Sequence, residues 1–167
     1  MSIQESHQLE LLFKQSRPGL VYYCMKFVGN PEDANEIVND VFVAIWKRKE
    51  HLVLDLSLKP YLYRSVHNKS LNFLAKRGIT IQETEEVPDI AQEHADPCKS
   101  LEYKELQKQL NTLISELPPR CQQIFILSRK EGLSHKEISE IMNISTKTIE
   151  NQITIALKYL KTNLLQK

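Results

Sequence analysis

The chain has 167 residues, a net charge of +1, and a composition of 41% hydrophobic and 26% charged residues. These values are typical of a soluble globular protein and exclude a chain that is basic throughout. Because only four glycines stand among many Leu, Ile, Lys and Glu residues, the composition favours helix over sheet, and we predict an all-α fold.

No apolar run approaches the ~20 residues that a membrane-spanning helix requires. The first residues, MSIQESHQLELLFKQS, lack the charged head and apolar body of a signal peptide. We therefore expect the protein to remain in the cytoplasm. The cysteines, Cys24, Cys98 and Cys121, are far apart and form no C-x-x-C pair, so the sequence predicts neither a disulfide framework nor a zinc site.

Acidic residues are concentrated in the middle of the chain. Residues 78–100 carry one lysine and six acidic residues, whereas residues 1–77 and 101–167 each have a net charge of +3. The middle segment begins with a glycine, contains Pro88 and Pro97, and has no helical apolar stripe. We therefore predict two small helical domains, residues 1–77 and 101–167, joined by a flexible acidic linker, residues 78–100.

Three helices are expected in the first domain, near residues 7–28, 31–49 and 58–77. The dipeptide Asn30-Pro31 marks the start of the second helix, because Asn is a favourable N-cap and Pro fits the first helical position. The acidic residues that follow would lie at the positive end of the helix dipole.

The second predicted helix has an apolar face and an acidic face. At about 100° per residue, one side of this helix collects Ala34, Ile37, Val38, Val41, Phe42, Ile45 and Trp46. Acidic residues recur every four positions on the other side, at Glu32, Glu36 and Asp40, with the apolar Val43 among them. A carboxylate metal site would have this spacing, but the chain has no Glu-x-x-His partner. A solvated face and a surface for a partner helix with arginines are the other interpretations.

The third predicted helix also has two different faces. Its apolar side consists of Leu62, Val66 and Phe73, with Tyr63, Ser70 and Leu74 beside them. Its polar side, which is almost free of acid, consists of Tyr61, Arg64, Ser65, Asn68, Asn72 and Lys76. A line of guanidinium and amide donors beside an aromatic ring fits single-stranded nucleic acid, whose bases stack on planar groups. The alternative is an ordinary polar surface helix.

Four helices are expected in the second domain, near residues 99–116, 118–130, 134–142 and 145–164. A capping-box pattern, Ser134 with Glu137, opens the third of them. Asn143 can adopt the left-handed conformation that turns the chain, and Ser145 can cap the last helix. Two helices joined so closely form a helix-turn-helix.

The last helix is expected to bury one face and expose the other. The predicted core residues are Ile149, Ile153, Ala156, Leu157 and Leu160. The predicted outward residues are Thr146, Lys147, Glu150, Asn151, Thr154 and Lys158. One such helix fits the DNA major groove, where its first turns reach base edges while Lys and Ser/Thr groups contact phosphates. A helical hairpin with a solvated face is the alternative.

Taken together, these patterns resemble the extracytoplasmic-function (ECF) sigma factors, two-domain transcription initiation subunits of the sigma-70 family. The resemblance covers residues 8–77 and 101–165. The residues that carry it are Asp33 to Phe42 with Trp46, Leu62-Tyr63-Arg64 with Asn68 and Asn72, Leu117-Pro118-Pro119-Arg120 with Phe125, and the helix-turn-helix stretch 131–161. The chain differs from many members at Asn39, where Gln is usual, and at Glu150, Gln152, Ile155 and Leu157, where basic residues are common.

The resemblance implies a role for each of the three outward faces. Core RNA polymerase would bind the acidic helix through Asp33, Glu36, Asn39, Asp40 and Val43. The −10 promoter element would be read by the loop of residues 50–57 with Tyr61, Arg64, Asn68, Asn72 and Lys76. The −35 element would be read by Thr146, Lys147, Glu150, Asn151, Thr154 and Lys158.

The resemblance also implies the partners, which are core RNA polymerase, promoter DNA and an anti-sigma factor that is often membrane-bound. It implies no enzymatic activity, no catalytic residue, no metal, no cofactor and no small-molecule substrate. A LuxR-type helix-turn-helix regulator is the alternative, because it shares the Leu-Ser-x-Lys-Glu-Ile pattern of residues 133–138. Such a regulator would need a sensing domain in front, and the all-helical first half is a poor match for a receiver. A helical carboxylate-metal hydrolase is disfavoured because the histidine ligands are missing.

Overall fold

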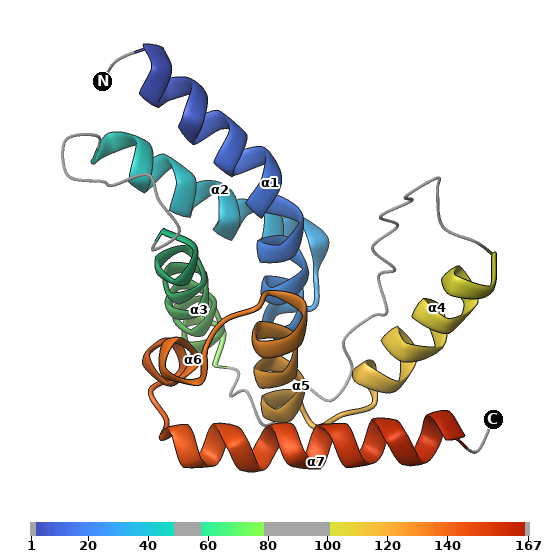
Figure 1. Cartoon of the computed structure of the whole chain (residues 1–167). Helices are drawn as coiled ribbons and strands as arrows, with labels where there is room; N and C mark the ends of the chain where they lie inside the picture. The colour runs from blue at the N-terminus through green and yellow to red at the C-terminus, as the bar shows by residue number, and fades with distance from the viewer. Residues whose placement is uncertain (1–2, 49–57, 79–100, 166–167) are drawn as a thin grey trace. The chain divides into compact units, whose positions relative to one another are not determined.

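The computed structural model describes residues 3–48, 58–78 and 101–165. In these residues all regular secondary structure is helical, which confirms the predicted all-α fold (Figure 1). The loop of residues 50–57 lies outside the described residues, as does the predicted linker of residues 78–100 except for Gly78. No helix within the described part of the chain is both long enough and apolar enough to cross a membrane.

The chain divides into two compact units. The helices of the first unit are α1 (Ile3–Val28), α2 (Pro31–Lys47) and α3 (Leu58–Lys76). The second unit contains α4 (Leu101–Ser115), α5 (Pro119–Phe125), the π-helix η2 (Ile126–Lys130) and α7 (Thr146–Leu165). The boundary between the two units passes through α6 (His135–Met142). This helix is described together with α7, which follows it directly in the chain. The domain limits inferred from the sequence remain a prediction.

In the first unit α1 packs against both α2 and α3 (Figure 1). Leu20, Tyr23 and Phe27 of α1 are almost completely buried. The ring of Tyr23 meets Phe27 edge-on at 5.1 Å and Tyr63 of α3 at 5.6 Å between centroids. Edge-to-face aromatic pairs add to the free energy that burial alone provides. The core of this unit is therefore built on the middle and last turns of α1.

The predicted core face of α2 is confirmed with one exception. Its buried residues are Ala34, Ile37, Val38, Val41, Phe42 and Ile45. The prediction was wrong for Trp46, which remains 43% exposed. Trp46 lies in the last turn of α2, where the groove between this helix and the first turns of α1 is still open, so its large ring is only partly covered.

Two polar contacts are buried between α1 and α3. The hydroxyl of Tyr23 and Nδ1 of His67 are 2.8 Å apart, and burial lowers the pKa of His67 to about 4 while it raises the pKa of Tyr23. The two side chains therefore form a neutral hydrogen-bonded pair at pH 7. Ser70 donates to the Val66 carbonyl at 2.7 Å, so the thiol of Cys24 donates to the Ser70 hydroxyl at 3.2 Å. Burial raises the pKa of Cys24 to about 11, which keeps the thiol protonated.

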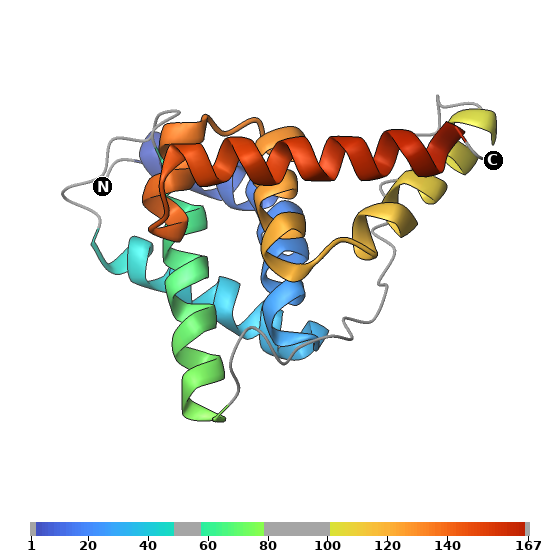
Figure 2. The same ribbon diagram turned by 90° about the horizontal axis from the view of Figure 1, so that it is seen from below.

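In the second unit α4 and α5 both pack against α7, a straight helix that α5 meets crosswise (Figure 2). The predicted core residues Ile149, Ile153, Ala156 and Leu160 are buried. The prediction was wrong for Leu157, which is 42% exposed. It lies about 100° around the helix from the buried Ala156, at the border of the face that packs into the core. The amide Nε2 of Gln122 donates to the Ile114 carbonyl at 2.9 Å and joins α5 to the end of α4.

The predicted helix of residues 118–130 is divided into α5 and η2. The bond from Glu131 N to Ile126 O, 3.1 Å long, spans five residues and gives this turn its wider π geometry. The chain then reverses at Gly132, whose φ of 70° is readily adopted by glycine. Leu133 N donates to Leu127 O at 3.0 Å and closes this end before α6 begins.

The buried Tyr23–His67 pair predicts a loss of stability in acid. The pKa of His67 is about 4 in the folded chain and near 6.5 in the unfolded chain. Between these values the unfolded chain binds a proton that the folded chain excludes, so stability is complete above pH 6.5 and falls as the pH approaches 4. The expected loss is roughly 3 kcal/mol. Urea unfolding between pH 7.5 and 4.5, followed by Trp46 fluorescence, measures it.

His67→Gln should flatten this pH dependence, even though it lowers the stability at neutral pH. The control His7→Gln removes an exposed histidine of the same unit and should keep the wild-type dependence. If His67→Gln kept the wild-type slope, another group would be responsible for the acid sensitivity.

Candidate functional site

Local hydrogen bonds fix the helix-turn-helix of α6 and α7. Ser134 Oγ accepts from Glu137 N at 3.1 Å, and the Glu137 carboxylate accepts from Ser134 N at 2.9 Å, which confirms the predicted capping box. Asn143 adopts the predicted left-handed conformation, with φ of 54°. Ser145 caps α7 by accepting from Thr148 N at 3.1 Å. Each of the signals inferred from the sequence is therefore present in the structure.

The turn between the two helices is held by one further residue of α6. Ser139 Oγ donates to the Ile144 carbonyl at 2.6 Å, and Ile144 N donates to the Ser139 carbonyl at 3.3 Å. This pair of contacts ties the residue after the turn to the middle of α6. The start of α7 is consequently fixed relative to α6.

The outward residues of α7 form a polar surface, here called the α7 face. All of its members are exposed, namely Thr146, Lys147, Glu150, Asn151, Thr154 and Lys158. The hydroxyl of Thr154 donates to the Glu150 carbonyl at 2.9 Å, so its hydrogen is used within the helix. Glu150 Oε1 lies 3.9 Å from Nδ1 of His135, the first residue of α6. The α7 face therefore presents one lysine in its first turn, an amide, and a carboxylate beside a histidine.

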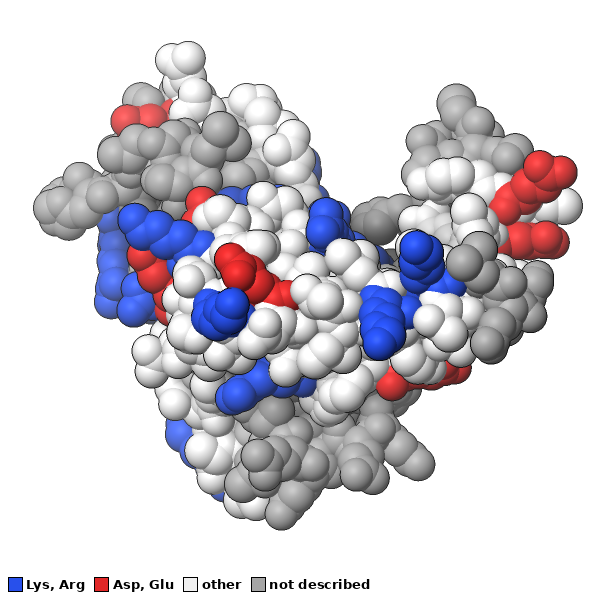
Figure 3. All heavy atoms as spheres, turned by 60° about the horizontal axis from the view of Figure 1, so that its bottom comes forward, with Lys and Arg blue, Asp and Glu red and all other residues white. Residues whose placement is uncertain are grey.

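On the face of the described residues that Figure 3 shows, Lys and Arg residues stand in several separate groups, with Asp and Glu residues near some of them.

The outward side of α3, here called the α3 face, consists of Tyr61, Arg64, Asn68, Asn72 and Lys76, all exposed. The opposite side of the helix is buried, with Leu62 and Val66 inaccessible to solvent. The end of α3 is fastened to the start of α2, because Arg77 lies 3.6 Å from the Asp33 carboxylate and stacks over the ring of Phe73 at 4.3 Å. The orientation of the α3 face is thus set by contacts on its inner side and at its end.

The residues expected on the outward side of α2 have two kinds of environment. Glu36, Asp40 and Val43 are exposed, Val43 by 49%. Asp33 is instead paired with Arg77, and its side chain is only 18% exposed. Asn39 also takes part in a contact within the unit, because its Oδ1 accepts a hydrogen bond from Arg17 of α1. We call Glu36, Asp40 and Val43 the α2 face.

Arg17 is a residue that the sequence did not single out. One end of its guanidinium donates to Asn39 and the other to Asn35 Oδ1 at 2.7 Å. The same group lies over the ring of Phe13, 5.2 Å from its centre, and this ring meets Phe42 of α2 edge-on at 4.5 Å. Arg17 therefore connects α1 to two successive turns of α2. No local pattern could reveal it, because the contact depends on how α1 and α2 are aligned.

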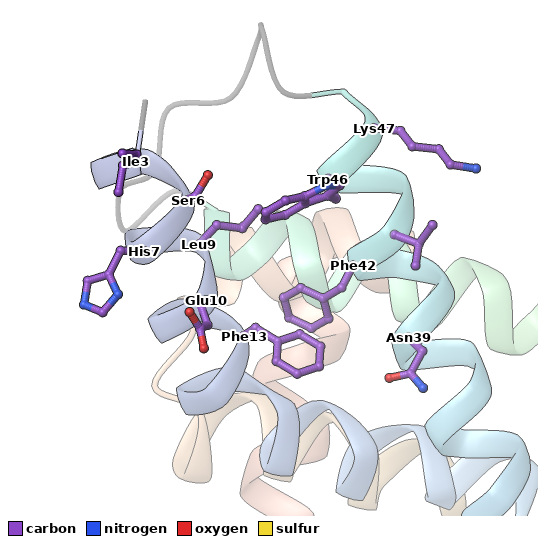
Figure 4. Close-up of a pocket in the computed structure, with 11 residues that line it drawn as sticks. Ile3, Ser6, His7, Leu9, Glu10, Phe13, Asn39, Phe42, Trp46 and Lys47 are labelled. Atoms are coloured by element: carbon purple, nitrogen blue, oxygen red, sulfur yellow. The ribbon is translucent and has the colours of Figure 1, made fainter. Parts of the chain in front are cut away.

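An apolar groove of about 770 Å³ adjoins the α2 face. It lies between the first turns of α1 and the last turns of α2, with Leu9, Phe13, Phe42 and Trp46 around it (Figure 4). Val43 also lines it. The exposed acidic surface and the apolar groove thus adjoin at Val43, an arrangement that is typical of a protein-binding site.

Comparisons with known proteins agree with this arrangement. Residues 12–79 match the family model "Sigma-70 region 2", and residues 107–160 match "Sigma-70, region 4". The RNA polymerase sigma factor NccH of Alcaligenes xylosoxydans xylosoxydans is 29% identical over 77% of this chain and 72% of its own length. The ECF RNA polymerase sigma factor SigW of Bacillus subtilis (strain 168) is 24% identical over 78% of this chain and 74% of its own length.

The chain belongs to the sigma-70 family, as an ECF sigma factor. The two matches occupy both halves of this sigma factor, in the order expected from the sequence, so the LuxR-type alternative is not favoured. The fold is also that of a solved sigma factor. The structure of CnrH in complex with the cytosolic domain of CnrY matches with a TM-score of 0.58 and 19% identity, over 95% of this chain and 88% of CnrH.

The contact of Arg17 with α2 predicts a measurable contribution to stability. In Arg17→Lys the ammonium keeps the charge but lacks the planar fork that donates to Asn35 and Asn39 together. We expect the free energy of unfolding to fall by about 1 kcal/mol. Urea unfolding at pH 7, followed by Trp46 fluorescence, measures the change.

Lys14→Arg is the matched control, because Lys14 lies on the same helix and is paired only with the exposed Glu10, at 3.1 Å. Its effect should stay within about 0.5 kcal/mol, as is usual at the surface. Equal effects of the two substitutions would contradict a special role for Arg17.

Proposed function

We propose that this sigma factor binds core RNA polymerase through the α2 face and the adjoining groove, and reads promoter DNA through the α3 and α7 faces. As an alternative sigma factor it directs transcription initiation by core polymerase. The observation that supports the assignment is that three helices bury their apolar sides while each exposes a polar side of different chemistry. The matched sigma-70 regions contain all three faces.

The α2 face is suited to a helical partner with basic residues. Glu36 and Asp40 offer exposed carboxylates that can accept charge-assisted hydrogen bonds from Arg or Lys. Val43 and the groove beside it offer apolar area that a partner would remove from water. Asp33 and Asn39 support this surface indirectly, because their contacts with Arg77 and Arg17 hold α2 in place. The resemblance to the family indicates the clamp helices of the polymerase large subunit as this partner.

The α3 face is suited to single-stranded promoter DNA. A sigma factor must help to open the duplex without a chemical step, and unstacking a base costs a few kcal/mol that capture of the freed base can offset. The Arg64 guanidinium can hold a phosphate, and the Asn68 amide can reach a base edge. Tyr61 adds an exposed aromatic ring at the start of the same face. The loop of residues 50–57, which lies outside the described residues, completes this proposed site.

The α7 face is suited to duplex DNA. Its first turns carry Lys147 and Asn151, and in the major groove Lys can contact phosphates while Asn pairs with adenine N6 and N7. Lys158 extends the face by two further turns. We assign this face to the upstream −35 element and the α3 face to the −10 element.

The proposal includes an inhibitory partner and a location. CnrH was solved in complex with the cytosolic domain of CnrY. The resemblance to the ECF family implies an anti-sigma protein, which is often membrane-bound. We infer such a partner for this chain and place its activity in the cytoplasm, where core polymerase and DNA are found. Sigma factors act by binding, and the proposal requires no catalytic step from this chain.

Assembly with core polymerase should depend on the α2 face. Asp40→Lys combined with Val43→Asp reverses a charge and places a carboxylate in the apolar part of the surface. We expect the double variant to lose co-purification with core polymerase while circular dichroism shows an unchanged helical content, since both positions are exposed.

The matched control is Lys158→Glu combined with Ile155→Asp, which makes the same kinds of change at the same spacing on exposed positions of α7. This control should still assemble with core polymerase. Retained assembly of the Asp40 and Val43 double variant would refute the assignment of the α2 face.

Promoter opening should depend on Asn68. In Asn68→Ala the base-reading amide is removed from an exposed position, so polymerase assembly and upstream duplex binding should persist. Open-complex formation, measured by the permanganate reactivity of unpaired thymines, should fall at least several-fold. A premelted template should restore part of a defect in melting but not a defect in base recognition. Wild-type opening rates in both Asn68→Ala and Arg64→Ala would show that the α3 face is only a polar surface.

A further inference from the structure

Glu150 is an unusual residue for the DNA-facing side of a sigma factor. It is 56% exposed in its side chain and lies on the α7 face between Lys147 and Thr154, where a carboxylate is repelled by DNA phosphates. Glu150 therefore does not raise the affinity of this face for DNA in general. It can instead raise the difference in affinity between one base sequence and another.

The structure places the Glu150 carboxylate beside α6. Its Oε1 is 3.9 Å from Nδ1 of His135, close enough for electrostatic attraction when the ring is protonated. His135 is the first residue of α6, where the helix dipole also favours a negative charge. The contacts of Ser139 with Ile144 keep the two helices in register, so the position of the carboxylate relative to α6 is defined.

This position belongs to the part of α7 that can reach base edges. Glu150 lies in the second turn of the helix, and the first turns of a recognition helix are those that enter the major groove. The neighbouring Asn151 is one residue further along, on the same exposed side. The carboxylate would therefore lie over base pairs as well as near the backbone.

The chemistry of a carboxylate limits the base that it can select. An ionised Glu is only an acceptor, and the major-groove donors are the amino groups of cytosine and adenine. Guanine and thymine present acceptor oxygens, and adenine presents N7 beside its amino group, so these bases repel a carboxylate. Cytosine N4 is the remaining match. We propose that Glu150 is a specificity-determining residue that selects a cytosine in the upstream element, and that His135 positions its carboxylate.

This inference rests on the proposed role of the α7 face in reading duplex DNA. It is tested with the full chain assembled with core polymerase and a duplex library whose upstream element is randomised above a fixed downstream element. Sequencing of the bound fraction gives the base preference at every position. For the wild type we expect cytosine at one position to be favoured by about tenfold over the other bases.

Glu150→Gln provides the sharpest variant, because Gln pairs with adenine N6 and N7. It should change the preference at this position from cytosine to adenine and leave the other positions as they were. Glu150→Ala should remove the preference there. His135→Ala should weaken the cytosine preference by about threefold, and His135→Gln should weaken this preference less. The control Lys158→Gln removes a charge from the same face and should weaken binding to all library members without changing any base preference.

Two results would overturn the inference. The first leaves the proposed role of the α7 face intact, and the second contradicts that role as well. If both Glu150 variants bound every library member more tightly with unchanged base preferences, the carboxylate would only repel the backbone, and the role of the α7 face would stand. If wild-type polymerase selected no base anywhere in the randomised element, the proposed role of the α7 face would fail together with the inference. Circular dichroism of each variant establishes that the second unit is folded.

Discussion

The burial of α1 against both α2 and α3 is the constraint on which the first unit depends. Leu20, Tyr23 and Phe27 fill the space between the helices and are almost inaccessible to water. Because α1 covers the inner sides of both neighbours, the outer sides of α2 and α3 remain available for partners. One shared core thus supports two exposed surfaces of different chemistry, an acidic one that we propose binds protein and a polar one, rich in donors, that we propose binds nucleic acid.

A few polar contacts between neighbouring parts of the chain support the proposed binding surfaces. Arg17 holds Asn35 and Asn39, Arg77 pairs with Asp33, and His135 faces Glu150 across the helix-turn-helix. Arg17 and Arg77 meet acceptors at the border of the α2 face, whereas His135 meets Glu150 within the α7 face. The residues proposed to bind partners are exposed, and their positions are set by these neighbours.

Features encoded by a few adjacent residues could be predicted from the sequence. The cap at Asn30, the capping box of Ser134 and the turn at Asn143 were found because each depends on hydrogen bonds within about four residues. Trp46 and Leu157 were misplaced because they lie at the borders of their apolar faces, where small differences in packing decide exposure. The groove and the Arg17 contact depend on the alignment of α1 with α2, and the π-helix has no local sequence signal.

The central claim is that this chain selects promoters only as a subunit of RNA polymerase. The most direct measurement is sequencing of RNA 5′ ends after in vitro transcription of genomic DNA by core polymerase, with and without the purified chain, alongside footprinting by the chain alone. We predict new start sites that share two upstream elements and appear only when the chain is added, with no footprint from the chain alone. A strong footprint without polymerase, together with an unchanged set of start sites, would contradict the account.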